Sequence, residues 1–265
     1  MEFGPVIFFV ILFGGVALVI FGVIAAHKAE QKRIAELGAW ADTHGLAFSP
    51  AKRHKTTYPA SIFKRGHSRY SRYHMVADLH DATPGLEAPA HIELFEYHFA
   101  ITTSNGKSST TTHYYHSCCA AYLGIDFGEI EIREERFTDR IAAVFGWGSI
   151  NFEDAEFSRR FLVKSPDRQR TYAIIGPSMI RLLMQHRGFH IETYGELLFI
   201  HISGRASVDQ FERLRSLVAG IAAQIPRVVV NEARARRGLP PQTEAGDAAP
   251  ASRSMFMQSQ SGGYD

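Results

Sequence analysis

An uninterrupted apolar stretch near the N-terminus constrains this chain more than any other feature. Residues 5–26, PVIFFVILFGGVALVIFGVIAA, contain no charged, amide or hydroxyl side chain. As an α-helix the stretch would extend about 33 Å, enough to cross a bilayer core of about 30 Å, whereas apolar runs of buried core helices are about 10–14 residues long. We predict a transmembrane helix at residues 5–26, after a short segment at residues 1–4. Its membrane-embedded positions include Pro5, Phe9, Leu12, Gly15, Leu18, Gly22 and Ala26.

The residues that flank this stretch predict its orientation. A cleaved signal peptide needs a basic N-terminal region and an apolar core of only about 7–15 residues, and residues 1–4 contain no Lys or Arg. The positive charges, Lys28, Lys32 and Arg33, follow the stretch. Because cytoplasmic flanks carry an excess of Lys and Arg, we expect an uncleaved single-pass protein of the bacterial inner (cytoplasmic) membrane. Its N-terminus would lie outside and its soluble domain in the cytoplasm.

Small residues within the stretch suggest a second role for it. Gly22 and Ala26 have the spacing of small residues that lets two membrane helices approach closely, and Gly15 precedes Gly22 by one heptad. Glycine is also common in membrane helices generally. Self-association through this helix is therefore one alternative, and a helix that contacts only lipid is the other.

Composition and motifs exclude several functional classes. Lys and Arg number 29 against 27 Asp and Glu, so no strong basic surface indicates a nucleic-acid partner. The two cysteines, Cys118 and Cys119, are adjacent, which is no disulfide framework and fits a reducing compartment. The sequence contains no GxSxG, Walker A, HExxH or CxxC pattern. We predict no enzymatic activity, no catalytic residue and no cofactor.

Hydrophobic patterning predicts an α+β fold for the rest of the chain. A helical pattern continues through a juxtamembrane stalk at residues 27–45. Residues 46–229 mix both periodicities and predict a single domain of antiparallel β-hairpins packed with helices. Hairpins are expected at residues 91–123 and 190–203, and helices at residues 139–146, 167–175, 177–187 and 207–226. The tail at residues 230–265 is rich in Ala, Gly, Pro, Ser and Gln and is predicted to be disordered.

Asn105-Gly106 is the clearest hairpin signal. This dipeptide favours a two-residue turn because both of its residues accept positive φ angles. Such a turn would pair residues whose numbers sum to 211, and His98 would lie directly opposite His113. A bulge would shift this register by one residue and exchange the faces of one strand.

The expected pairing suggests a weak candidate for a metal site. His98 and His113, with Glu96 on the same face, offer two imidazoles and a carboxylate, a set that binds zinc in open sites. His116 and Cys118 are further weak candidates and share the opposite face of the strand. A cross-strand histidine pair is also typical of a half-exposed polar face, so we assign no metal ligand from the sequence.

Residues 52–72 interleave basic and aromatic side chains. Lys52, Lys55, Lys64 and Arg65 alternate along the chain with tyrosines and phenylalanines. Such a segment near a membrane can bind anionic lipid headgroups, each charge contributing about 1 kcal/mol near the surface. The plainer interpretation is the solvated face of two or three strands.

A pattern of core positions resembles one family. It comprises Phe157, Phe161, Val163, Asp167, Tyr172, Ala173, Pro177, Met179 and Leu183. The pattern is similar to one in uncharacterised bacterial single-pass membrane proteins, over roughly residues 28–226. The resemblance implies an N-terminal transmembrane helix and one cytosolic α+β domain. That domain has no assigned activity, so the resemblance transfers no functional residue.

These observations together predict a membrane-anchored interaction or scaffold domain. Its partners would be the lipid bilayer and a membrane or envelope protein. One alternative is a metal- or ligand-binding sensor or enzyme that uses the His98/His113 face. Another is a domain that binds anionic lipid through residues 52–72.

Overall fold

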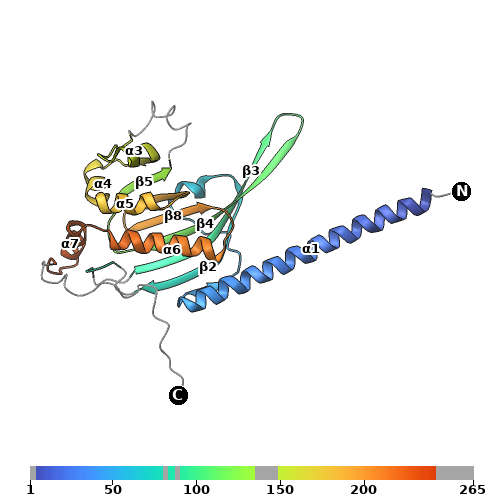
Figure 1. The fold of residues 1–265 in the computed structure, drawn as a ribbon, viewed down its shortest axis with the longest axis horizontal. Coiled ribbons are helices and arrows are strands. Elements are labelled where there is room, and N and C mark those ends of the chain that lie inside the picture. The colour runs from blue at the N-terminus through green and yellow to red at the C-terminus, as the bar shows by residue number, and fades with distance from the viewer. Residues whose placement is uncertain (1–3, 80–82, 87–89, 135–148, 243–265) are drawn as a thin grey trace, which may run out of the picture.

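The computed structural model describes residues 4–79, 83–86, 90–134 and 149–242, and side chains from residue 14 onward. The fold is α+β, as predicted, with one eight-stranded antiparallel sheet in the order β1-β2-β3-β4-β8-β7-β5-β6. The strands are β1 Ala47–Ser49, β2 His67–Leu79, β3 Ala90–Ser104, β4 Ser109–Tyr122, β5 Glu129–Glu134, β6 Phe161–Lys164, β7 Phe189–Tyr194 and β8 Leu197–Ser203. Figure 1 shows α6 lying across the sheet.

Capping residues mark the first turns of several helices. Ser207 begins α6 by accepting a hydrogen bond at Oγ from the Gln210 N–H, and Asp167 caps α4 through the Arg170 N–H. Pro177 occupies the first turn of α5, where its missing N–H has no cost. The helices are α1 Gly4–Thr43, the 3₁₀ turn η1 Ser61–Lys64, α3 Ala155–Arg160, α4 Arg168–Ile174, α5 Pro177–Gln185, α6 Val208–Ala223 and α7 Arg227–Arg236.

Each face of the sheet buries its own hydrophobic core. Leu94 and Ile200 point to the larger core, which is shared with α6 and the C-terminal part of α1. Phe95 and Phe199 point the other way and form a smaller aromatic core with Phe63 of η1. The alternation along β3 and β8 follows from the two-residue period of a strand.

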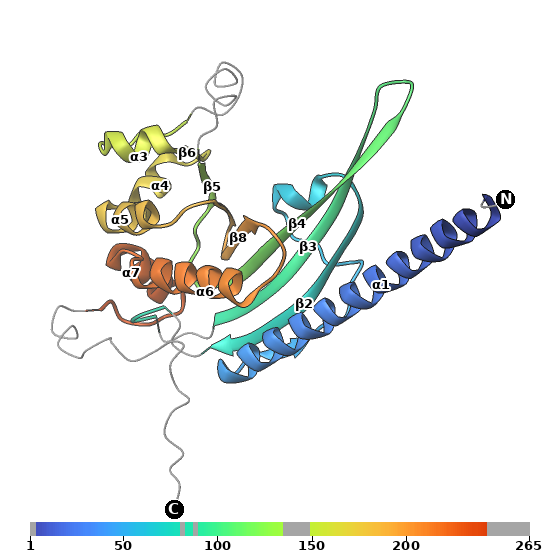
Figure 2. The same cartoon turned by 45° about the vertical axis from the view of Figure 1, so that its right-hand side comes forward.

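Helix α1 runs without a break from Gly4 to Thr43. Leu37 and Ala41 are buried against the domain, while the N-terminal half extends away from it (Figures 1 and 2). Among the residues that the structure describes, no helix combines the length and the apolar character that crossing a membrane requires. The side chains of residues 5–13, within the predicted span, lie outside the described part.

The register of the β3–β4 hairpin differs from the prediction. Ser104 pairs with Ser109, so paired residue numbers sum to 213 and the loop has four residues. The Asn105 side chain causes this, because its Oδ1 accepts hydrogen bonds from the N–H groups of Lys107 (3.1 Å) and Ser108 (2.9 Å). A shift of two leaves every side chain on its expected face. The predicted two-residue turn was therefore wrong, although the predicted faces are correct.

The C-terminal end of the domain also departs from the prediction. Pro226 does not end the fold, because it is the N-cap of a further helix, α7. Val229, Val230 and Ala233 of this helix are buried, so a disordered tail from residue 230 is incorrect. Arg234 donates to the Pro240 carbonyl at 2.7 Å. The helix expected at residues 139–146 lies outside the described residues.

Candidate functional site

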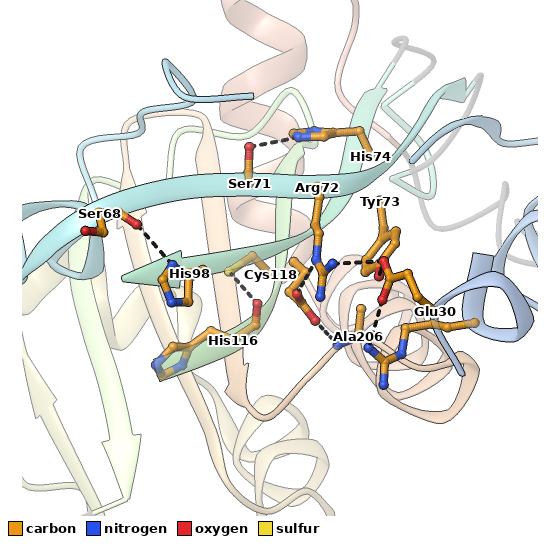
Figure 3. A network of polar contacts seen from close by, with 12 residues as sticks. Glu30, Ser68, Ser71, Arg72, Tyr73, His74, His98, His116, Cys118 and Ala206 are labelled. Carbon is orange, nitrogen blue, oxygen red and sulfur yellow. Dashed lines mark hydrogen bonds and ion pairs between the residues drawn. The ribbon is translucent and has the colours of Figure 1, made fainter. Parts of the chain in front are cut away.

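Glu96, one of the weak candidates for a metal ligand, is fully buried and already bonded. Its Oε1 accepts from Arg72 Nε at 2.7 Å, and its Oε2 accepts from the Ala206 N–H at 2.7 Å (Figure 3). Both oxygens therefore have strong donors. The carboxylate belongs to an internal ion pair and not to a site shared with the histidines.

The side chains of His98 and His113 are in contact, but the two residues are not directly opposite each other in the β3–β4 pair. His98 lies opposite Tyr115 in the register, and its Nε2 is 3.0 Å from His113 Nδ1. Its Nδ1 donates to the Ser68 carbonyl at 3.0 Å, so Nε2 accepts from His113. Burial lowers the pKa of His98. Both nitrogens of His98 have partners, and these residues do not form the weak candidate site with three ligands.

Cys118 and His116 lie on the opposite face, as expected. The Cys118 thiol is buried and its Sγ donates to the His116 carbonyl at 3.7 Å. Burial raises the pKa of Cys118 well above its ordinary value, and also raises the pKa of Cys119. Both cysteines are free thiols. Neither is an accessible thiolate, which agrees with a structural role.

A buried joint links α1 to the sheet. Arg72 bridges two carboxylates, because its Nη1 lies 2.9 Å from Glu30 on α1 while its Nε binds Glu96. The Tyr73 hydroxyl donates to the same Glu30 carboxylate, as Figure 3 shows. Tyr73 has a φ of +56° and lies in a β-bulge between Arg72 and Met75. Bulges re-aim side chains, and this one places neighbouring Arg72 and Tyr73 side chains against Glu30.

A second cluster, which we call the histidine row, was not predicted. It consists of His116 on β4, His201 on β8 and His190 on β7. His201 pairs directly with His190, and its ring centroid lies 4.8 Å from that of His190 and 5.1 Å from that of His116. The predicted hairpin at residues 190–203 already puts His190 and His201 on neighbouring strands, but only the pairing of β4 with β8 adds His116 to the row.

Two carboxylates lie at the His190 end of the row. His190 Nε2 is 3.2 Å from Glu131 Oε1 and 3.9 Å from Glu192 Oε1. The neighbouring His190 side chain lowers the pKa of Glu131. Glu192 accepts from the Ser61 N–H (2.9 Å), from Ser61 Oγ (2.8 Å) and from the Tyr194 hydroxyl (2.8 Å). These donors hold the carboxylate in place.

His116 and His201, the two most buried histidines of the row, have ring nitrogens without a hydrogen-bond partner among the described residues. His201 is only 8% exposed, and neither of its ring nitrogens has a hydrogen-bond partner among the described residues. His116 Nδ1 likewise has no partner in the described part of the chain. Burial, with a smaller contribution from Arg65, lowers the pKa of His116 to about 4, and burial takes the pKa of His201 well below its ordinary value. Each therefore offers an uncharged imidazole near neutral pH.

The histidine row opens into a cleft of about 490 Å³. His116, His190 and His201 line it together with residues from β5, α6 and the loop before β7. Its other charged lining residues are Arg65, Arg133, Glu134, Arg187 and Arg213. The cleft gives a small solute a route to an otherwise buried group of side chains.

Several basic residues of the 52–72 segment are used inside the domain. Arg72 is buried in the joint. Arg53 forms an ion pair with Glu93, with 3.3 Å between Arg53 Nη1 and Glu93 Oε1. Arg69 donates to the carbonyls of Gly66 and Phe63. Lys52, Lys55, Lys64 and Arg65 are exposed, so lipid binding through residues 52–72 stays a prediction.

Comparison with known proteins gives one remote likeness. No family model matches the chain, and no curated protein matches it. Among solved structures, the mycobacterial trehalose monomycolate transport factor A, TtfA, is similar at 8% identity and a TM-score of 0.44. The match covers 80% of this chain and 98% of that one. A likeness this remote carries no inference about function.

Proposed function

We propose that this chain is a membrane-anchored interaction domain, with α1 as its anchor and the β3–β4 hairpin as a contact element. The proposal rests on one observation above all. Apolar side chains on all sides of α1 are exposed, including Leu18 at 73% and Phe21 at 72%. Among the described side chains of α1, the exposed large apolar residues are Val16, Leu18, Val19, Ile20, Phe21, Val23 and Ile24.

The distribution of these side chains favours lipid over a protein groove. Successive helix residues are about 100° apart, so the four consecutive residues 18–21 spread around most of the circumference. A helix that packs on a partner needs an apolar stripe on one side, whereas a helix that is apolar all round fits a membrane. Residues 5–26 supply the length, and Lys28, Lys32 and Arg33 favour a cytoplasmic domain at the bacterial inner membrane.

The joint would hold the domain at a fixed angle to the anchor. Glu30 lies one helical turn beyond residue 26 and bonds both Arg72 and Tyr73. A buried charged contact of this kind restricts rotation about the helix more than a flexible linker would. We infer that the domain presents one defined side to its partner.

The end of the β3–β4 hairpin supports a protein partner. Residues 101–104 of β3 extend past the part that pairs with β2, and residues 109–114 of β4 extend past the part that bonds to β8 and to Gly204 after it. The hairpin projects from the body of the domain in Figures 1 and 2. Unpaired strand edges are templates for strand addition by another chain. We call residues 101–114 the arm.

Charged substitutions in the anchor should release the protein from membranes. We expect Leu18→Arg with Phe21→Arg to move the chain from the carbonate-washed membrane pellet to the supernatant, because each arginine costs about 2.5–3.5 kcal/mol inside a membrane helix. The control is Gln31→Arg with Ala35→Arg, at exposed positions beyond the predicted span, and it should stay in the pellet. Extraction of the wild-type chain by carbonate would contradict the anchor.

A photo-crosslinking residue on the arm should capture a partner. We expect a crosslinker at the exposed Thr111 to give a discrete adduct in cells, since this position borders the free edge of β4. The same crosslinker at the exposed Arg181 on α5 serves as control and should not give that adduct. Gel mobility and mass spectrometry provide the measurement. Equal products from both positions, or none from Thr111, would count against the arm.

A further inference from the structure

We propose that His190, His201 and Glu192 form a binding site for a divalent transition metal of the zinc class. Each of these residues offers one ligand atom, and the three atoms lie within 4.8 Å of one another. The site is separate from the anchor and the arm, so it goes beyond the proposed function. Two imidazoles with one carboxylate form a known ligand set for zinc.

His201 is the strongest indication of a missing ligand. A neutral imidazole carries one N–H donor and one acceptor nitrogen. Here both atoms are buried without a hydrogen-bond partner among the described residues, a costly arrangement that native proteins rarely keep without a reason. A metal ion would use the lone pair of one nitrogen. His190 lies directly opposite across the β7–β8 pair, so the two rings can share one ion.

Glu192 is positioned as a metal-binding carboxylate. Ser61 supplies two donors to it and Tyr194 a third. An ionised carboxylate has about four acceptor positions, so the bonds orient the group and leave capacity for an ion. Such outer hydrogen bonds are a regular feature of protein metal sites. Since η1 supplies Ser61, the short turn that covers the smaller core also fixes this ligand.

The local charge favours a cation over an anion at this point. Glu131 Oε1 and Glu192 Oε1 lie 3.2 and 3.9 Å from His190 Nε2, and an anion placed there would face both carboxylates. Arg133 forms an ion pair with Glu131, with 3.0 Å between Arg133 Nε and Glu131 Oε1. Arg65, Arg187 and Arg213 also line the cleft; Arg65 lies over the Phe99 ring and Arg213 donates to the Arg187 carbonyl. The cleft provides the route by which an ion would enter.

Zinc titration of the full-length chain tests the proposal. The protein is purified in detergent without a polyhistidine tag, stripped with chelator, and titrated with Zn²⁺ by calorimetry. We expect one ion per chain and a higher melting temperature with zinc, because a ligand that binds only the native state stabilises it. His201→Ala and His190→Gln should each weaken binding at least about 100-fold, more than is typical for loss of an outer-shell group.

The variants are chosen so that misfolding cannot mimic the result. His190→Gln alters a partly exposed ring, and far-UV circular dichroism reports whether each variant is folded. His98→Ala with His113→Ala removes the other histidine pair and should bind zinc like the wild type. The proposal fails if the folded wild-type chain binds no stoichiometric zinc, or if folded His190→Gln binds as tightly as the wild type. It also fails if the His98/His113 variant loses binding.

Discussion

Arg72→Met is expected to lower the free energy of unfolding by about 3–5 kcal/mol, which is the usual cost of leaving one partner of a buried ion pair alone. Glu96 is fully buried and would keep only the Ala206 N–H as a donor. Glu30 would lose its ion pair with Arg72 at the same time and would keep the hydrogen bond from the Tyr73 hydroxyl. Denaturant unfolding of the full chain in detergent, followed by far-UV circular dichroism, provides the measurement.

A double variant separates the lost charge from the lost side chain. Arg72→Met with Glu96→Gln removes the buried negative charge and keeps an acceptor for the Ala206 N–H, so it should recover much of the stability. Arg181→Met is the matched control, because this arginine is exposed on α5 and its guanidinium contacts Ser178 in the same helix; a change within about 0.5 kcal/mol is expected. If Arg72→Met were as mild as Arg181→Met, the joint would have no part in stability.

Phe199→Ala should have an effect of similar size on the other face of the sheet. Phe199 is fully buried in the smaller core. The centroid of its ring lies 5.6 Å from that of Tyr58, 5.5 Å from that of Phe63 and 6.4 Å from that of Phe95. Removal of a buried phenylalanine ring costs about 3–5 kcal/mol, because burial is lost and a cavity remains. Thermal or denaturant unfolding measures the change.

The effect of Phe199→Ala should extend from the smaller core to the histidine row. Phe63 belongs to η1 and packs on Phe199, and Ser61 of the same turn holds Glu192. A loosened η1 should therefore weaken zinc binding as well as stability. Val228→Ala alters an apolar side chain that is 58% exposed and should change stability by no more than about 0.5 kcal/mol. A loss from Phe199→Ala no greater than that of Val228→Ala would contradict the packing described here.

Local patterns were informative wherever neighbouring residues decide the structure. The α+β class, the helices at residues 167–175 and 177–187, and the faces of β3 and β4 all follow from periodicity and capping. The two-residue turn failed because the Asn105 side chain bonds its own loop, a choice that the dipeptide alone does not reveal. The tail prediction failed because Pro226 can end one helix and begin another. In both cases the local sequence is compatible with two structures, and the sequence pattern favoured the one that does not form.

The candidate sites show the limit of such reasoning more clearly. The predicted hairpin places Glu96, His98 and His113 close together. In the structure, however, Arg72 and the Ala206 N–H donate hydrogen bonds to the Glu96 carboxylate. The histidine row adds His116, which is distant in sequence, to the two histidines of the predicted hairpin at residues 190–203, and no spacing rule connects it to them.

The sequence by itself determined the apolar N-terminal stretch, its basic flank and the alternation that makes an α+β domain, because each depends on residues near one another along the chain. The tertiary structure alone decided which strands outside the predicted hairpins became neighbours. That order depends on how all strands and helices together bury their apolar faces, and it places His116 beside His201 and Arg72 between Glu30 and Glu96.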